Sequence, residues 1–181
     1  GFYEWVVLKI KGLDTQMAEG PLFSNIRQGE VWRLFSPCVL HAEFFHIFFN
    51  MIWLWILGRP IEQRIGFPKT LLLTVAVGIG SNTIQYLVSG PLFLGYSGIV
   101  MGLAGFTWMR QKIAPWEGYP LNRITMIFLL LFVGAMFILS MGAFFLQIFS
   151  GLAFAPNIAN TAHIIGGIIG IFFGRLSSFA E

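Results

Sequence analysis

The sequence predicts an all-α membrane protein that crosses the bilayer several times, and two observations support this prediction. Charged residues make up 10% of the 181 residues and hydrophobic residues 56%, whereas a soluble domain carries about 25% charged residues. Lys, Arg, Asp and Glu are also absent from three stretches, which are residues 44–58, 70–109 and 124–174. This composition argues against a water-soluble enzyme, and the small net charge of +3 argues against a nucleic-acid partner.

The charge-free stretches are long enough for five membrane helices, because a helix crosses the hydrocarbon layer in about 20 residues. Basic residues occur between helices one and two, between three and four, and after helix five, so these connections are predicted to be cytoplasmic. Residues 1–40 are then an external segment at the membrane interface, and residues 41–178 form one membrane domain. The five helices are predicted near residues 41–65, 70–89, 97–110, 124–141 and 160–177.

Several polar residues are predicted to lie at one depth inside the membrane, where polar groups are costly and therefore candidates for function. Ser97, His163 and Asn50 each precede a basic residue at the cytoplasmic end of their helix by 12 to 14 residues. This spacing corresponds to about 20 Å of helix. His46 lies one helical turn before Asn50 on the same helix face. The four side chains are therefore expected to meet near the outer side of the membrane.

These residue types suit acyl transfer. A serine hydroxyl becomes nucleophilic when a neighbouring base takes its proton, and His163 is the candidate base for Ser97. Asn50 and His46 can donate hydrogen bonds to the oxyanion that develops during such a reaction. No carboxylate is expected at this depth, so the sequence predicts a Ser–His dyad. No cofactor and no metal site are predicted, because there is one cysteine and no carboxylate beside the histidines.

A dyad formed from two helices requires them to approach closely, and two of the predicted helices carry glycines at helical spacing. Such small residues let helix backbones touch in lipid. His163 and Gly170 are seven residues apart and therefore share one helix face. The glycines are Gly98, Gly102 and Gly105 in the third helix and Gly166, Gly167, Gly170 and Gly174 in the fifth.

Four motifs in this order resemble those of the rhomboid intramembrane serine proteases. The segment 95–98 (Gly-Tyr-Ser-Gly) resembles the GxSG nucleophile motif, and residues 41–50 resemble the HxxxxHxxxN helix. Residues 162–166 resemble the last helix with its AH pair, and Trp32–Arg33 is similar to the WR pair of the first loop. The resemblance spans about residues 30–176.

The resemblance implies a rhomboid fold of six core helices, of which the first is missing from this chain, and cleavage of transmembrane protein substrates near the outer membrane face. The resemblance implies that Ser97 is the nucleophile and His163 the general base. His46 and Asn50 are the oxyanion donors. We expect a multi-pass integral protein of a bacterial inner (plasma) membrane. The loop Gly142–Asn157 resembles the external cap over the site.

Two alternatives remain open. A catalytically inactive rhomboid-like protein that binds membrane clients is expected to lack one of the motif residues, and none is missing. A metal or transport site formed by His41, His46 and His163 would have no carboxylate or thiol ligand. His41 is expected to be structural or gating, and to point away from His46 because five residues separate them on a helix.

Overall fold

The computed structural model describes residues 23–150 and 158–181, and all regular elements within these ranges are helical. Residues 1–22, which form the larger part of the predicted interface segment, lie outside the described residues. The described part of this segment consists of short helical turns. These are α2 (Ser24–Arg27) and two 3-10 turns, Val31–Leu34 and Ser36–Val39.

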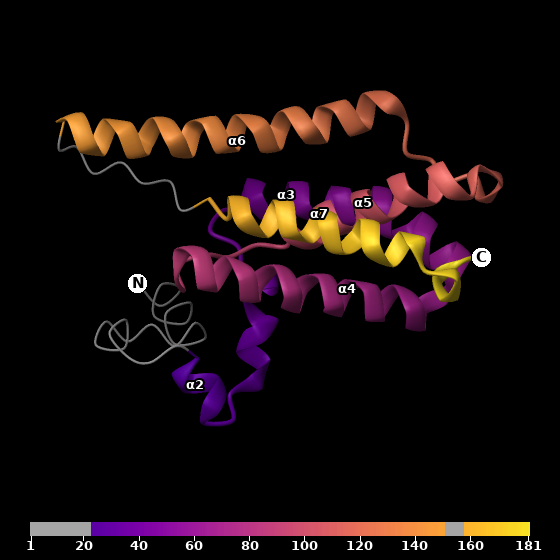
Figure 1. The fold of residues 1–181 in the computed structure, drawn as a ribbon, viewed down its shortest axis with the longest axis horizontal. Helices are drawn as coiled ribbons and strands as arrows, with labels where there is room; N and C mark the ends of the chain where they lie inside the picture. The colour runs from indigo at the N-terminus through magenta and orange to yellow at the C-terminus, as the bar shows by residue number, and fades with distance from the viewer. Residues whose placement is uncertain (1–22, 151–157) are drawn as a thin grey trace.

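The next helices form one long apolar stretch with a break in it. Helix α3 (Phe44–Trp53) continues through a π-helical turn (Leu54–Gly58) into α4 (Arg59–Ser89), as Figure 1 shows. Gly66 interrupts α4 with φ of 80° and ψ of 160°, a conformation that glycine adopts without strain. Pro68 follows and disfavours helical geometry at the residue before it. The break coincides with the predicted connection between the first two helices.

Helix α5 (Ser97–Ile113) occupies the centre of the bundle, where it packs along α7 (Asn160–Arg175) while α4 contacts both. The two helices run in the same direction. A Cβ atom added to Gly166 would overlap the carbonyl oxygen of Gly98, so their backbones are in direct contact. The close glycine contact predicted from the sequence is therefore confirmed. The core side chains around α5 that are fully buried include Ile61, Leu73, Val77, Ile99, Leu103 and Phe106.

Helix α6 (Arg123–Ser150) is longer than the sequence predicted. The predicted end near residue 141 is wrong, because the helix continues to Ser150. The predicted cap loop Gly142–Asn157 is therefore wrong over residues 142–150, and its remaining residues 151–157 lie outside the described residues. No proline occurs between residues 124 and 150, and a single glycine in a helix interior costs only about 1 kcal/mol relative to alanine. Gly142 is therefore too weak a signal to end an otherwise apolar helix.

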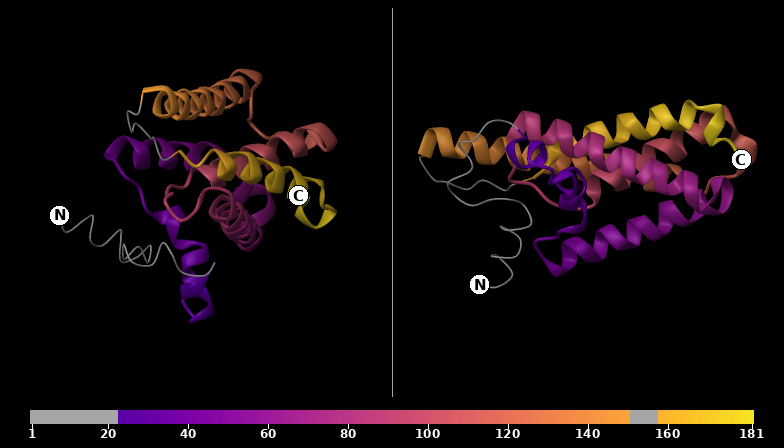
Figure 2. Two further views of the ribbon diagram at one scale, coloured as in Figure 1. Left: turned by 60° about the vertical axis from the view of Figure 1, so that its left-hand side comes forward. Right: turned by 90° about the horizontal axis from the view of Figure 1, so that it is seen from below.

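Helix α6 lies along the outside of the bundle, as Figures 1 and 2 show from three directions. It makes few contacts with the other helices. The ring of Phe128 stacks on Trp53 of α3 with centroids 5.7 Å apart. Near its other end, the Oγ of Ser140 accepts a hydrogen bond from Asn160 Nδ2 at 2.8 Å.

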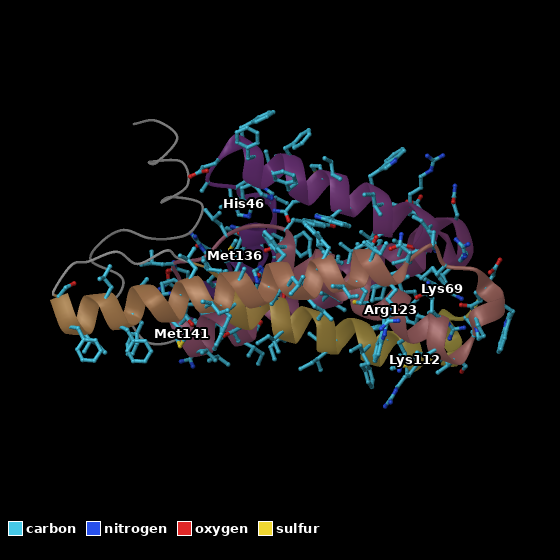
Figure 3. All side chains as sticks on the ribbon, turned by 90° about the horizontal axis from the view of Figure 1, so that it is seen from above. His46, Lys69, Lys112, Arg123, Met136 and Met141 are labelled. Carbon is cyan, nitrogen blue, oxygen red and sulfur yellow. The ribbon has the colours of Figure 1, made fainter. Side chains whose placement is uncertain are left out.

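Two of the described helical stretches, Phe44–Ser89 and Arg123–Ser150, are long and apolar enough to cross a membrane. The total of five crossings remains a prediction. The labelled cations Lys69, Lys112 and Arg123 lie toward one end of the bundle and His46 toward the other, as Figure 3 shows.

A buried ion pair closes the end of the bundle that carries these cations. Arg110 at the end of α5 donates two hydrogen bonds to the carboxylate of Glu117, and the two residues are 4% and 6% exposed. Arg110 also donates to the carbonyl oxygen of Gly174 at 3.3 Å, which ties α5 to the end of α7. The hydrogen bonds from Arg110 hold the pKa of Glu117 below its usual value.

Candidate active site

Ser97 and His163 meet where α5 and α7 begin. Ser97 is the first residue of α5, and His163 lies in the first turn of α7 and is 5% exposed. The hydroxyl oxygen of Ser97 lies 2.7 Å from Nε2 of His163, although the two residues are 66 positions apart in the sequence. The glycine contacts between α5 and α7 explain this approach, because they leave no side chain between the two helix backbones.

The other ring nitrogen of His163, Nδ1, is buried and has no hydrogen-bond partner among the described residues. The orientation of the ring therefore depends on how α7 is held. Gln85 of α4 contributes to this, because its Oε1 accepts a hydrogen bond from the backbone N–H of Ala162 at 2.9 Å. Gln85 is 3% exposed.

Gln85 is not among the predicted site residues, although the sequence carries a signal for it. Ser81, Asn82 and Gln85 are polar residues at helical spacing within an apolar helix, and all three are buried. Such residues face the inside of a helix bundle rather than lipid.

His46 and Asn50 lie on α3, which approaches the turn that precedes Ser97. The ring of His46 lies against Gly95, since a Cβ atom added to this glycine would be 2.6 Å from His46 Nε2. Gly95 also has a φ of +118°, which side-chain-bearing residues rarely adopt. Asn50 is 5% exposed, and its Nδ2 is buried without a hydrogen-bond partner in the part of the chain that the structure describes. A donor held in this way is available to an incoming acceptor.

The prediction that His41 and His46 point in different directions is wrong. His41 precedes α3, which begins at Phe44, so the angular spacing of a helix does not apply to it. The two imidazole rings are in edge-to-face contact with centroids 4.9 Å apart. His41 Nε2 also accepts a hydrogen bond from the backbone N–H of Tyr96 at 3.4 Å.

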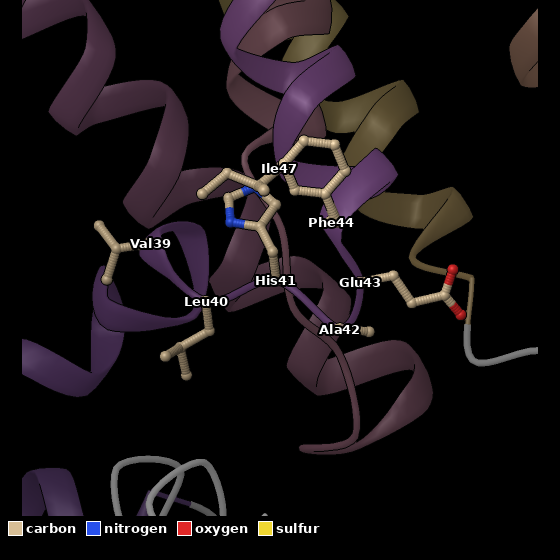
Figure 4. Close-up of a pocket in the computed structure, with 7 residues that line it drawn as sticks. All are labelled: Val39, Leu40, His41, Ala42, Glu43, Phe44 and Ile47. Atoms are coloured by element: carbon tan, nitrogen blue, oxygen red, sulfur yellow. The ribbon is translucent and has the colours of Figure 1, made fainter. Parts of the chain in front are cut away.

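A cavity of about 480 Å³ opens beside His41 at the start of α3. Figure 4 shows His41 there with Phe44 and Ile47 of the first helical turn. Ser97 and His163 are not among its lining residues, so the cavity does not contain the serine–histidine pair. The lining residues are Val39, Leu40, His41, Ala42, Glu43, Phe44 and Ile47.

The described residues contain no group of three or more His, Cys, Asp or Glu side chains placed to hold a metal ion. The metal site considered for His41, His46 and His163 therefore receives no support from the geometry. The geometry instead suits attack on a carbonyl group, because the hydroxyl–imidazole pair lies near the His46 ring and near Nδ2 of Asn50, which has no partner among the described residues.

Residues 28–178 match the Rhomboid domain family, and the chain therefore belongs to this family. The chain is similar to the rhomboid protease GlpG of Salmonella choleraesuis, with 37% identity over 149 residues, which cover 82% of this chain and 49% of the relative. Identity to the rhomboid protease GlpG of Salmonella paratyphi A is 36% over the same length and the same shares of the two chains. The chain spans about half the length of the curated relatives it matches.

Proposed function

We propose that this protein is an intramembrane serine endopeptidase that hydrolyses peptide bonds of transmembrane protein substrates through Ser97 and His163. The observation that supports this most strongly is the 2.7 Å approach of Ser97 Oγ to His163 Nε2. Membership of the rhomboid family and similarity to relatives named rhomboid proteases support the same function.

In the proposed reaction, the hydroxyl of Ser97 donates its hydrogen bond to Nε2 of neutral His163. Ser97 Oγ attacks the carbonyl carbon of the substrate peptide while His163 takes the proton. The oxyanion accepts hydrogen bonds from Nδ2 of Asn50, from His46 and from the backbone N–H of Ser97 at the start of α5. His163 then gives its proton to the leaving amine, and a water molecule hydrolyses the acyl-enzyme by the reverse sequence of proton transfers.

The proposed reaction takes place near the outer face of a bacterial inner membrane, where a substrate helix must unwind locally to expose a peptide bond. The uncharged ends of α5 and α7 that carry Ser97 and His163 support this location, because the basic residues Lys112 and Arg175 lie at the opposite ends of the same helices. A client-binding protein without catalysis would not require a serine hydroxyl within hydrogen-bond distance of an imidazole.

The test is cleavage of a labelled single-span model substrate after reconstitution of the protein in lipid vesicles. We expect Ser97→Ala and His163→Ala each to lose activity by about 10³-fold or more. Ser89→Ala, which changes an exposed serine at the end of α4, serves as the control and should cleave like the unmodified protein. Normal cleavage by Ser97→Ala or by His163→Ala would rule out the proposed function.

A further inference from the structure

His41 is a buried polar residue that the proposed reaction does not use. It is 8% exposed and precedes the helix that carries His46 and Asn50. Its Nε2 accepts the backbone N–H of Tyr96, the residue directly before Ser97. Because a buried backbone N–H requires a partner, this bond fixes the orientation of the peptide group that leads into Ser97.

A second hydrogen bond ties the same turn to the segment that precedes α3. The backbone N–H of Gly95 donates to the carbonyl oxygen of Pro37 at 2.9 Å. The segment before α3 is in turn held on α4, because Asn82 Nδ2 donates to the carbonyl oxygen of Leu34 at 3.0 Å. The turn before Ser97 is thus supported from a segment that is itself fixed to the bundle.

The His41 ring also supports the candidate oxyanion donor. It contacts the edge of His46, and the His46 ring lies against Gly95. His41, His46 and the Gly95–Tyr96 turn therefore form a closed set of contacts, in which His41 touches both of the other members. A change at His41 reaches the position of Ser97 and the position of His46 together.

To accept the N–H of Tyr96, His41 must be neutral and carry its proton on Nδ1. The groups around it favour this form. Burial favours the neutral imidazole, because a charged ring at this position would lose its hydration. Glu43 lines the same cavity but is exposed to solvent.

We propose that His41 is a positioning residue for the proposed reaction: it accepts the Tyr96 N–H and thereby holds the turn that presents Ser97 to His163 and to the oxyanion donors. This inference rests on the proposed function. His41, the first histidine of segment 41–50, then acts by holding the backbone before Ser97 and does not contact the substrate.

The first experiment compares two substitutions that each keep one property of His41. His41→Gln retains an acceptor at the position of Nε2, whereas His41→Phe retains a planar ring and has no acceptor. Cleavage of the single-span substrate is measured in vesicles. The number of reactive Ser97 sites is determined by complete labelling with a fluorophosphonate, and kcat is the cleavage rate per labelled site. We expect His41→Phe to lower kcat by about 10- to 100-fold with KM changed less than twofold, as for a misplacement of about 1 Å.

His41→Gln should keep kcat within about threefold of the unmodified protein, since a backbone N–H donates a hydrogen bond to an amide oxygen as well as to an imidazole nitrogen. Val31→Ala, at an exposed position in the segment before α3, is the control and should not change kcat. Equal kcat values for His41→Phe and His41→Gln, or a normal kcat per site for His41→Phe, would overturn the positioning role. Absence of Ser97-dependent cleavage by the unmodified protein would instead defeat the proposed function, and this inference with it.

A second measurement determines which ring nitrogen of His41 carries the proton in the unmodified protein. The chain has three histidines, so ¹⁵N-histidine NMR of the protein in lipid gives a spectrum that can be assigned with single substitutions at the other two. We expect His41 at neutral pH to carry its proton on Nδ1 and to show an unprotonated Nε2. A proton on Nε2 would contradict the hydrogen bond and the role proposed for it.

Discussion

The contact between α5 and α7 makes a quantitative prediction for substitution of Gly170. A Cβ atom at this position would overlap the carbonyl oxygen of Gly102 and lie 2.6 Å from its carbonyl carbon. Ordinary van der Waals contact begins at 3.4 Å, so contact with the carbonyl carbon alone requires the helices to separate by about 0.8 Å, and the nearer oxygen requires more. The obstructing atoms belong to backbone and cannot rotate away. Gly170→Ala is therefore expected to destabilise the protein by about 1–3 kcal/mol or more.

The same displacement reaches the site, because Gly170 lies on the same face of α7 as His163. A shift of about 0.8 Å or more would lengthen the Ser97–His163 distance from 2.7 Å to about 3.5 Å or more, beyond the usual range of a hydrogen bond. We expect kcat for cleavage of the single-span substrate to fall by about 10- to 100-fold in the fraction that remains folded.

Two glycines of α6 provide matched controls. A Cβ atom added to Gly134 or Gly142 meets nothing within 4 Å, so Gly134→Ala and Gly142→Ala should be neutral or stabilise the protein by up to about 1 kcal/mol through helix propensity. Unfolding in detergent micelles, followed by circular dichroism, and vesicle cleavage assays measure the series. If Gly170→Ala were as stable and as active as Gly134→Ala, the close packing of α5 on α7 would be refuted.

Three further predictions concern single side chains. Asn50→Ala should lower kcat by about 10²- to 10³-fold with little change in KM or in unfolding temperature, since Nδ2 has no partner among the described residues; a KM effect alone would contradict an oxyanion role. Gln85→Leu should destabilise the protein by about 1–3 kcal/mol in equilibrium unfolding, because it leaves the N–H of Ala162 unpaired, and an unchanged midpoint would exclude that bond. Glu117→Gln should destabilise it by about 3–5 kcal/mol by leaving Arg110 buried without its partner. Because Arg110 lowers the pKa of Glu117 in the folded state, the ion pair contributes its full stability above the usual pKa of 4.5 and loses it as the pH falls from there through the lowered value. The unfolding free energy of Glu117→Gln should accordingly depend less on pH below about 4.5, and an equally steep dependence in both proteins would refute this assignment.

Much of the fold follows from where the sequence lacks charge. Helices α5 and α7 begin at Ser97 and Asn160, as expected from the positions of glycine, proline and the basic residues. Their mutual contact follows from glycines at helical spacing, because this pattern has little other use in a membrane helix. The end of α6 could not be predicted in the same way, since no strong helix-breaking residue precedes Gly151.

The candidate site was predicted where it depends on helix position and missed where it depends on irregular backbone. The Ser97–His163 contact agrees with their expected common depth. The contact of His41 with Tyr96 depends on a segment before α3 that has no periodicity, so no spacing rule applies to it. The Arg110–Glu117 pair was missed for a different reason, because charged residues at a helix end and in the turn that follows are ordinarily solvent-exposed.

The central claim is that Ser97 is a nucleophile activated by His163, and covalent labelling tests it most directly. The protein is treated in lipid vesicles with a fluorophosphonate, which reacts with activated serines, and the adduct is located by mass spectrometry of the digested chain. The account predicts a single adduct on Ser97 that forms at least about 100-fold more slowly in His163→Ala. An adduct on another residue, no adduct, or labelling of Ser97 at an unchanged rate in His163→Ala would contradict it.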